Sequence, residues 1–111
     1  GTQFLMSGSY TGNFTATGDV TAYSDSRLKR DIVTIDNAMQ KVENLHGVNF
    51  TRIDDNTRST GLIAQDVLEV LPEAVHTDED GMHSLAYGNI VGLLVEAMKE
   101  LKAEINELKN K

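Results

Sequence analysis

Residues 87–111 read YGNIVGLLVEAMKELKAEINELKNK, and the spacing of their apolar residues decides the fold. From Tyr87 onward, apolar side chains recur at alternating steps of four and three residues, which is the heptad pattern of a coiled coil. The pattern predicts one long C-terminal helix with an apolar row along one side. The residues at heptad positions a and d, called the seam below, are Val91, Leu94, Met98, Leu101, Ile105 and Leu108.

Two arrangements of this helix fit the pattern. Its first half carries the additional apolar residues Ile90, Leu93 and Val95, which favour packing against its own domain. Its second half favours association between copies, because Glu104 at position g and Lys109 at the following position e would pair between parallel neighbours. The choice of residues at a and d does not by itself separate a dimer from a trimer.

The preceding residues predict a small α+β domain. We expect a loop at 24–35 that leads into a strand, and then a helix of about ten residues that Asp36 caps and Gly47 ends. Further on we expect strands at 48–53 and 61–64, a helix at 65–71 stopped by Pro72, and a hairpin with strands at 74–77 and 82–85.

Residues 1–23 differ in composition from the rest of the chain. Threonine, aromatic residues and valine alternate roughly between glycines, and no charge appears before Asp19. The pattern predicts short β-strands that need neighbouring strands to become ordered, such as two further copies of the same segment. Gly1-Thr2 resembles a truncation point, so we expect the chain to be the tail end of a longer protein.

Composition excludes several classes of function. The net charge of −7 argues against a protein that binds nucleic-acid phosphates. No apolar run reaches the length of a membrane span. Without cysteine there are no disulfides or thiolate metal sites, and the spacing of His46, His76 and His83 does not suit a metal. We therefore expect no metal, no cofactor, no small-molecule substrate and no nucleic-acid or membrane partner.

The segment Ser24-Asp25-Ser26-Arg27-Leu28-Lys29 places a serine and a lysine five residues apart. Lysine can activate a serine hydroxyl when it is neutral, and with an ordinary pKa of about 10.4 it must be desolvated or placed near other cations. Arg27 and Arg30 flank Lys29 and are candidates for that role. The hydroxyl of Ser24 would attack the carbonyl of Tyr23, and water would cleave the resulting ester. On spacing alone, a capping serine and a solvated lysine explain the pair better.

The segment from Ser24 to Lys29, followed by Ile32, resembles the opening signature of the autocleaving intramolecular chaperone domain of phage tailspikes and tail fibres. The resemblance extends in order over residues 24–108. It continues through residues 38–45, 47–50, 61–67, 71–75, 80–81, Tyr87 and 93–97. This resemblance reverses the preference for the capping explanation.

The resemblance implies a homotrimer in which residues 1–23 end a β-stem and residues 24–111 form the chaperone domain. The domain would bring three chains together and help to wind the upstream stem of the same polypeptide. It would then release itself by a single cut between Tyr23 and Ser24, with Ser24 and Lys29 as the catalytic pair. Assembly would take place in the host cytoplasm, and the parent fibre would belong to the virion tail.

Two other functions remain open from the sequence. The first is a trimerisation module that does not cleave and stays in place as a fibre tip. The second is a membrane-tethered transcription-factor precursor with the same domain, which would need a nearby membrane span. The first differs from the self-cleaving chaperone in the mass of the mature protein.

Overall fold

The computed structural model describes residues 12–111 and divides the chain into two units, Gly1–Ile32 and Val33–Lys111. In the described part of the first unit the regular element is a 3-10 turn, η1 (Ser26–Leu28). Residues 12–23 contain no strand, and residues 1–11 lie outside the described part. The predicted stem strands require neighbours that a single chain does not supply, so they stay a prediction.

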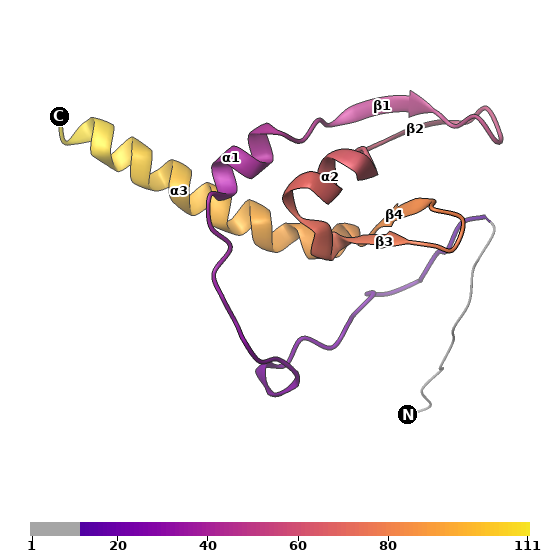
Figure 1. Ribbon diagram of the computed structural model, residues 1–111, viewed down its shortest axis with the longest axis horizontal. Helices are drawn as coiled ribbons and strands as arrows, with labels where there is room; N and C mark the ends of the chain where they lie inside the picture. The colour runs from indigo at the N-terminus through magenta and orange to yellow at the C-terminus, as the bar shows by residue number, and fades with distance from the viewer. Residues whose placement is uncertain (1–11) are drawn as a thin grey trace. The chain divides into compact units, whose positions relative to one another are not determined.

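The second unit combines helices with two small antiparallel sheets (Figure 1). Each sheet is a two-stranded hairpin, β1 with β2 and β3 with β4. The α+β prediction is confirmed at this level, as a mixed fold with a long C-terminal helix. The elements are α1 (Ala38–Glu43), β1 (Val48–Thr51), β2 (Arg58–Gly61), α2 (Ala64–Val70), η2 (Pro72–Ala74), β3 (Val75–Thr77), β4 (His83–Leu85), η3 (Tyr87–Ile90) and α3 (Val91–Lys109).

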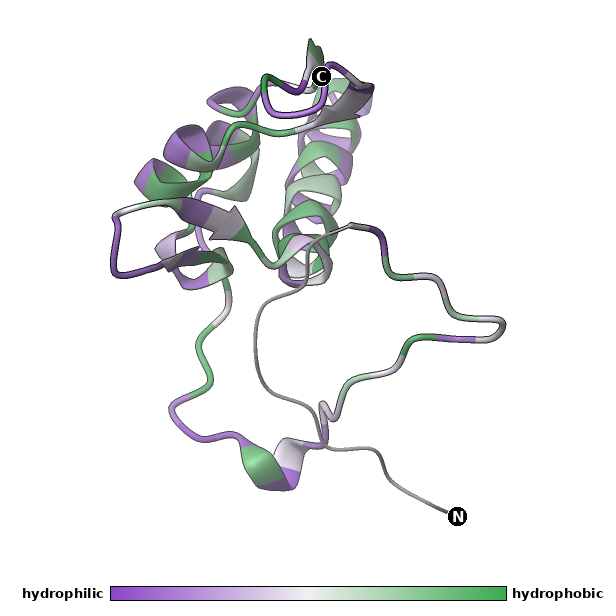
Figure 2. Ribbon diagram, turned by 90° about the vertical axis from the view of Figure 1, so that its right-hand side faces the viewer, coloured by the Kyte–Doolittle hydropathy of each residue, from purple (hydrophilic) through white to green (hydrophobic). Residues whose placement is uncertain are grey.

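The core of this unit is small and is assembled mainly by the helices. Leu93 and Val67 are its largest fully buried side chains. Figure 2 shows apolar and polar residues side by side on the helices, as expected where one face is buried. A core of this size gives limited stability to an isolated chain, so association would add to it. The buried core residues are Ala38, Val67, Leu71, Ala74, Ile90, Leu93 and Ala97.

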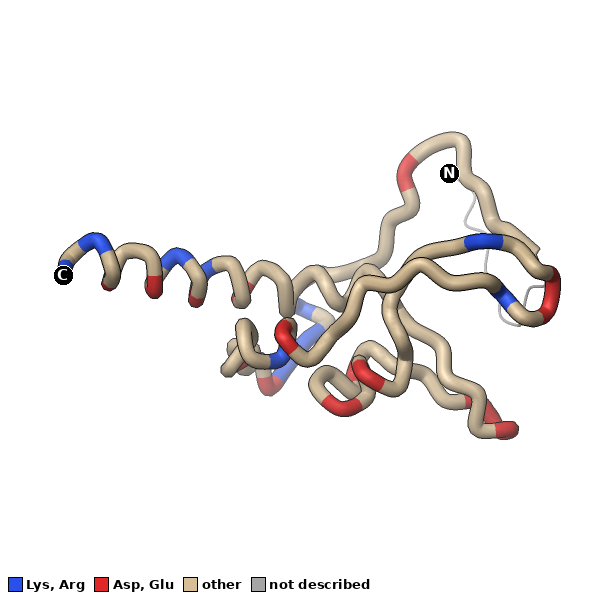
Figure 3. The backbone as a smooth tube through the Cα atoms, turned by 90° about the horizontal axis from the view of Figure 1, so that it is seen from above, with Lys and Arg blue, Asp and Glu red and all other residues tan. Residues whose placement is uncertain are grey.

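Helix α3 is the longest element, with 19 residues and a length of about 28 Å. Its first half packs against α1, and its second half extends beyond the rest of the unit (Figure 1). Residues 101–111 are all exposed. Figure 3 shows Lys and Glu alternating along this second half, as expected for a helix that is surrounded by water on its polar sides.

The start of α1 is capped by a residue far away in the sequence. The prediction that Asp36 caps this helix is wrong. The Asp36 carboxylate instead accepts a hydrogen bond from Lys41 Nζ at 3.2 Å. The two carboxylate oxygens of Glu100 on α3 instead accept from the backbone N–H groups of Ala38 and Met39, each at 2.9 Å. Exposed amides at a helix start need acceptors and favour negative charge, and Glu100 supplies both.

Helix α1 is also shorter than predicted, with six residues ending at Glu43. The residue before it, Asn37, has φ of 49°, in the left-handed region that asparagine tolerates better than most residues. This conformation turns the chain into the helix, so the entry is set by Asn37 and by α3.

Two strand predictions are corrected. Residues 32–36 form no strand, and Ile35 instead packs against the core of the unit. The second strand of the first hairpin is β2 at 58–61, earlier than the predicted 61–64, with Val48 opposite Gly61. Leu62 leaves the ladder because its side chain joins the core. The predicted helix at 65–71, the hairpin at 74–85 and the long C-terminal helix are confirmed.

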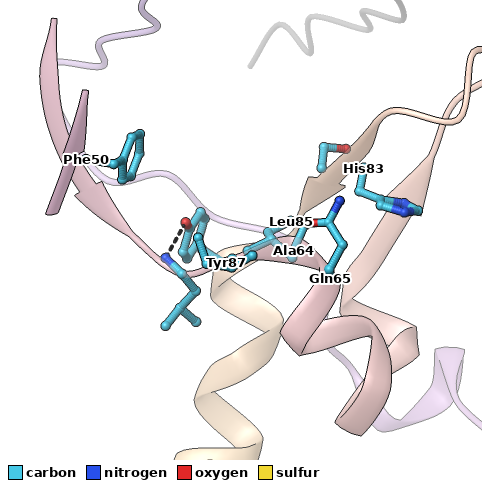
Figure 4. A pocket seen from close by; sticks show the side chains of 9 residues that line it. Phe50, Ala64, Gln65, His83, Leu85 and Tyr87 are labelled. Atoms are coloured by element: carbon cyan, nitrogen blue, oxygen red, sulfur yellow. Dashed lines mark hydrogen bonds between the residues drawn. The ribbon is translucent and has the colours of Figure 1, made fainter. Parts of the chain in front are cut away.

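Tyr87 joins the first hairpin to the segment that leads into α3. The backbone N–H of Leu62 donates to the Tyr87 hydroxyl at 3.1 Å, as Figure 4 shows. Gly61 lies directly against that hydroxyl, and a Cβ at this position would come closer to the oxygen than atoms can approach. The close contact therefore favours glycine at residue 61, because a Cβ there would push the Tyr87 hydroxyl away.

The Glu100 cap predicts a pH-dependent stability. Hydrogen bonds from the backbone N–H groups of Met39 and Ala38 lower the pKa of the Glu100 carboxyl. A lowered pKa stabilises the fold at neutral pH, and this contribution is lost as the pH falls through the lowered value. We expect Glu100→Gln to lower the Tm by several degrees at neutral pH, and the gap from wild type to close in acid. Thermal unfolding at fixed protein concentration measures both.

The matched control is Glu107→Gln, because Glu107 occupies the same heptad position one heptad later and is exposed. It should leave the Tm almost unchanged at every pH. Equal losses for the two variants at neutral pH would show that the charge on α3 matters and the cap does not.

The contact at Gly61 predicts a steric cost. Gly61→Ala should destabilise the fold by about 1–3 kcal/mol, because the added methyl group meets the Tyr87 hydroxyl. Gly47→Ala is the control, since a Cβ there meets nothing within 4 Å. In urea unfolding, Tyr87→Phe should recover part of the loss when combined with Gly61→Ala, because it removes the clashing oxygen. Strictly additive effects would contradict this explanation.

Candidate functional site

The structure brings Ser24 and Lys29 together. Lys29 Nζ donates a hydrogen bond to Ser24 Oγ at 2.5 Å, and both side chains are exposed. Tyr23 precedes Ser24 and is also exposed. The predicted serine and lysine are thus in direct contact within one chain, beside the peptide bond predicted to be cut.

The contact depends on the turn between the two residues. In η1 the backbone N–H of Leu28 donates to the carbonyl of Asp25 at 3.0 Å, and that of Lys29 donates to the carbonyl of Ser26 at 3.1 Å. The side chain of Asp25 caps this turn by accepting from the backbone N–H of Arg27 at 2.9 Å. The turn folds the chain back, so that Lys29 reaches the residue just before the cap.

Asp25 and Arg27 also form a two-point ion pair. Arg27 Nη2 donates to Asp25 Oδ2 at 2.8 Å, and Arg27 Nε donates to Oδ1 at 3.1 Å. The side-chain and backbone hydrogen bonds from Arg27 lower the pKa of the Asp25 carboxyl, so it stays ionised well into acid. The same pair raises the pKa of Arg27.

These pairings change the role predicted for the two arginines. Arg27 is paired with Asp25, and Arg30 lies 3.7 Å from Asp31. Each cation beside Lys29 therefore has a carboxylate neighbour, and both arginines are largely exposed, so water screens their effect on the lysine. Lys29 itself is exposed. Desolvation and neighbouring cations are the two features that could activate the lysine. In the single chain, neither is well developed.

The second candidate site is the seam of α3. Its six residues lie on one side of the helix and are 43 to 71 % exposed. Leu93 and Ala97 lie on the adjoining side of α3 and are buried in the unit, as is Ile90 at the end of η3. Ile90 and Leu93 thus pack within the domain as expected, whereas Val95 does not and is 46 % exposed. One face of α3 is used inside the chain, and the seam remains open to water along the whole helix.

A shallow hollow of about 320 Å³ lies between the two hairpins (Figure 4). Phe50, Leu85 and Tyr87 give it apolar walls, and Gln65 and His83 add polar groups. Gln65 belongs to the first turn of α2. Within the lining we find no nucleophile placed beside a base, so the hollow has no catalytic arrangement of its own.

The remaining polar residues do not form a further site in the part of the chain that the structure describes. His46 lies 3.4 Å from Asp66, and His83 contacts Thr77 Oγ1 at 2.7 Å. Among residues 12–111, no three histidine or acidic side chains gather closely enough to hold a metal ion. None of the described helices is both long and apolar enough to cross a bilayer.

The sequence analysis did not single out Asp25 and Glu100. An aspartate two residues before the backbone N–H that it caps is a local signal, which the spacing Asp25–Arg27 carries. Glu100 carries no such signal, because its partners are more than sixty residues away.

Comparisons with known proteins identify a family and several relatives. Residues 24–76 match the model of a peptidase family described as "Chaperone of endosialidase". The chain is 37% identical over 97 residues to the long tail fiber protein Gp37 of Enterobacteria phage K3, covering 79% of this chain and 8% of that protein. It is 39% identical over 108 residues to Gp37 of Enterobacteria phage Ox2, covering 88% and 42%.

The chain thus spans less than half of each of these relatives. The family match begins at Ser24. Residues 24–76 belong to the family described as the chaperone of endosialidase.

Proposed function

We propose that this chain is an intramolecular chaperone of a phage tail fibre that trimerises, helps to fold the upstream β-stem and then cuts itself between Tyr23 and Ser24. The observation that carries the cut is the contact of Lys29 Nζ with Ser24 Oγ. The family match, which begins at Ser24, supports the chaperone role, and so do the tail fibre relatives. The virion tail is the corresponding location of the parent fibre.

The cut proceeds by a shift of an acyl group. Ser24 Oγ attacks the carbonyl carbon of Tyr23 while neutral Lys29 takes the hydroxyl proton. The bond between this carbon and the Ser24 nitrogen breaks, and the nitrogen takes up a proton to become an amine. Water then hydrolyses the ester, leaving a carboxylate on Tyr23 and the hydroxyl on Ser24. The reaction occurs once per chain and needs no cofactor.

The exposed contact of the single chain explains why the cut would await assembly. Lys29 is solvated, and its cationic neighbours are paired. Winding of three stems would strain the Tyr23–Ser24 peptide and remove water from the lysine, and both effects favour the attack. The lysine is thus in position before assembly and becomes reactive only with it.

The seam of α3 supports association with two further copies. An exposed apolar row along a helix is costly in water, and a parallel coiled coil buries it. Three chains held in register raise the local concentration of their stems, whose long-range strand pairing is slow on its own. Release of the chaperone then removes the template and leaves the stem kinetically stable.

The main alternative is a trimerisation module that does not cleave and remains as a fibre tip. The exposed Lys29 favours this alternative, since a lysine that activates a hydroxyl has to be removed from water. The mass of the mature chain decides between the two.

The catalytic pair predicts the products. Freshly expressed wild type should give two fragments, divided between Tyr23 and Ser24, while Ser24→Ala and Lys29→Ala stay whole in intact mass spectrometry. Loss of the nucleophile should abolish the cut, and loss of the lysine should slow it by at least about a hundredfold. A cut at the same bond in Ser24→Ala would exclude the mechanism. A wild type that stays whole as a trimer would identify the fibre-tip module.

The seam predicts the assembly state. Leu101→Asp should sediment as a monomer at a concentration where the parent chain is a trimer, because it places a charge in the centre of the coil. Ala103→Asp adds the same charge on the opposite side of the helix and should leave the trimer intact. Sedimentation equilibrium distinguishes them, and a trimer of Leu101→Asp would place the association surface elsewhere.

A further inference from the structure

The turn that holds Lys29 against Ser24 is exposed throughout. None of its residues is buried, and residues 21–34 are exposed without exception. A three-residue 3-10 turn has weak hydrogen-bond geometry and does not persist on its own. The contact between Lys29 and Ser24 therefore needs a local interaction that favours the folded-back conformation.

Asp25 provides such an interaction. Its Oδ1 accepts from the backbone N–H of Arg27 at 2.9 Å, and its two oxygens accept from the Arg27 guanidinium. Since Asp25 directly follows Ser24, the three hydrogen bonds fix the direction in which the chain leaves the nucleophile. Arg27 in turn lies two residues before Lys29. The ion pair of Asp25 with Arg27 therefore spans most of the loop between Ser24 and Lys29.

We propose that Asp25 is a positioning residue for the self-cleavage, which acts by capping the η1 turn and thereby keeps the Lys29 amine on the Ser24 hydroxyl. This inference rests on the proposed function. The hydrogen bonds of Asp25 go to Arg27, so its effect passes through the backbone N–H of Arg27. Small displacements of a catalytic group reduce rates strongly, and a weak turn amplifies the loss of one cap.

Asp25 could instead act only through its charge, by neutralising Arg27 beside Lys29. Asparagine separates the two roles, because its side-chain oxygen still accepts from the Arg27 N–H and carries no charge. Asp31 provides a second way to separate the capping role of Asp25 from the role of its charge. It is the carboxylate partner of Arg30, equally close to Lys29 in the sequence, and it lies outside the turn.

The test measures the fraction of chain cut against time by intact mass spectrometry, with sedimentation to verify that every variant assembles as the wild type does. The full chain is used for wild type, Asp25→Ala, Asp25→Asn, Asp31→Ala and Ser24→Ala. We expect Asp25→Ala to cut about tenfold more slowly and Asp25→Asn to stay within about threefold of wild type. Asp31→Ala should cut at the wild-type rate.

The outcomes separate this inference from the proposed function. If wild type stays whole, or Ser24→Ala is cut, the proposed self-cleavage fails and this inference fails with it. If wild type cuts and Ser24→Ala does not, the self-cleavage stands. The role of Asp25 is then overturned when Asp25→Ala keeps the wild-type rate, when Asp25→Asn is as slow as Asp25→Ala, or when Asp31→Ala is equally slow.

Discussion

The packing of α1 on α3 is the contact on which the second unit depends. Two short hairpins and helices of six and seven residues have little stability of their own. Helix α3 supplies Leu93 and Ala97 to the core and the Glu100 carboxylate to the first amides of α1. The segment that enters α1 is thereby held on the same helix that carries the seam.

Helix α3 buries one side within the unit and leaves the seam exposed, which suits the proposed association. Ile90, Leu93 and Ala97 are already buried in a single chain, so assembly does not have to displace them. The seam lies on the adjoining side of the helix, and its residues are 43 to 71 % exposed. A domain built in this way can fold before it meets other copies, and it can join them without unfolding.

Local and periodic signals predicted much of this structure. The heptads placed α3, and the turn residues around Asp78 placed the second hairpin, because both patterns depend on neighbours in the sequence. Of the site, the contact of Ser24 with Lys29 agrees with the family resemblance, which spacing alone did not favour. The cap of α1 could not be predicted, because it joins residues 62 positions apart. Likewise β2 is polar, and its limits follow from the tertiary contacts of Leu62.

The order of the elements along the chain determines the order in which they are synthesised. The ribosome completes the η1 turn long before α3, and the residues from Lys29 to Lys109 take roughly 4–16 s to add at ordinary elongation speeds. During this interval the serine and lysine already lie within reach of each other on a nascent chain that has no partner. The proposed cut at that stage would detach the stem from its template, so under this proposal slow chemistry at the exposed contact would protect each chain until translation has finished.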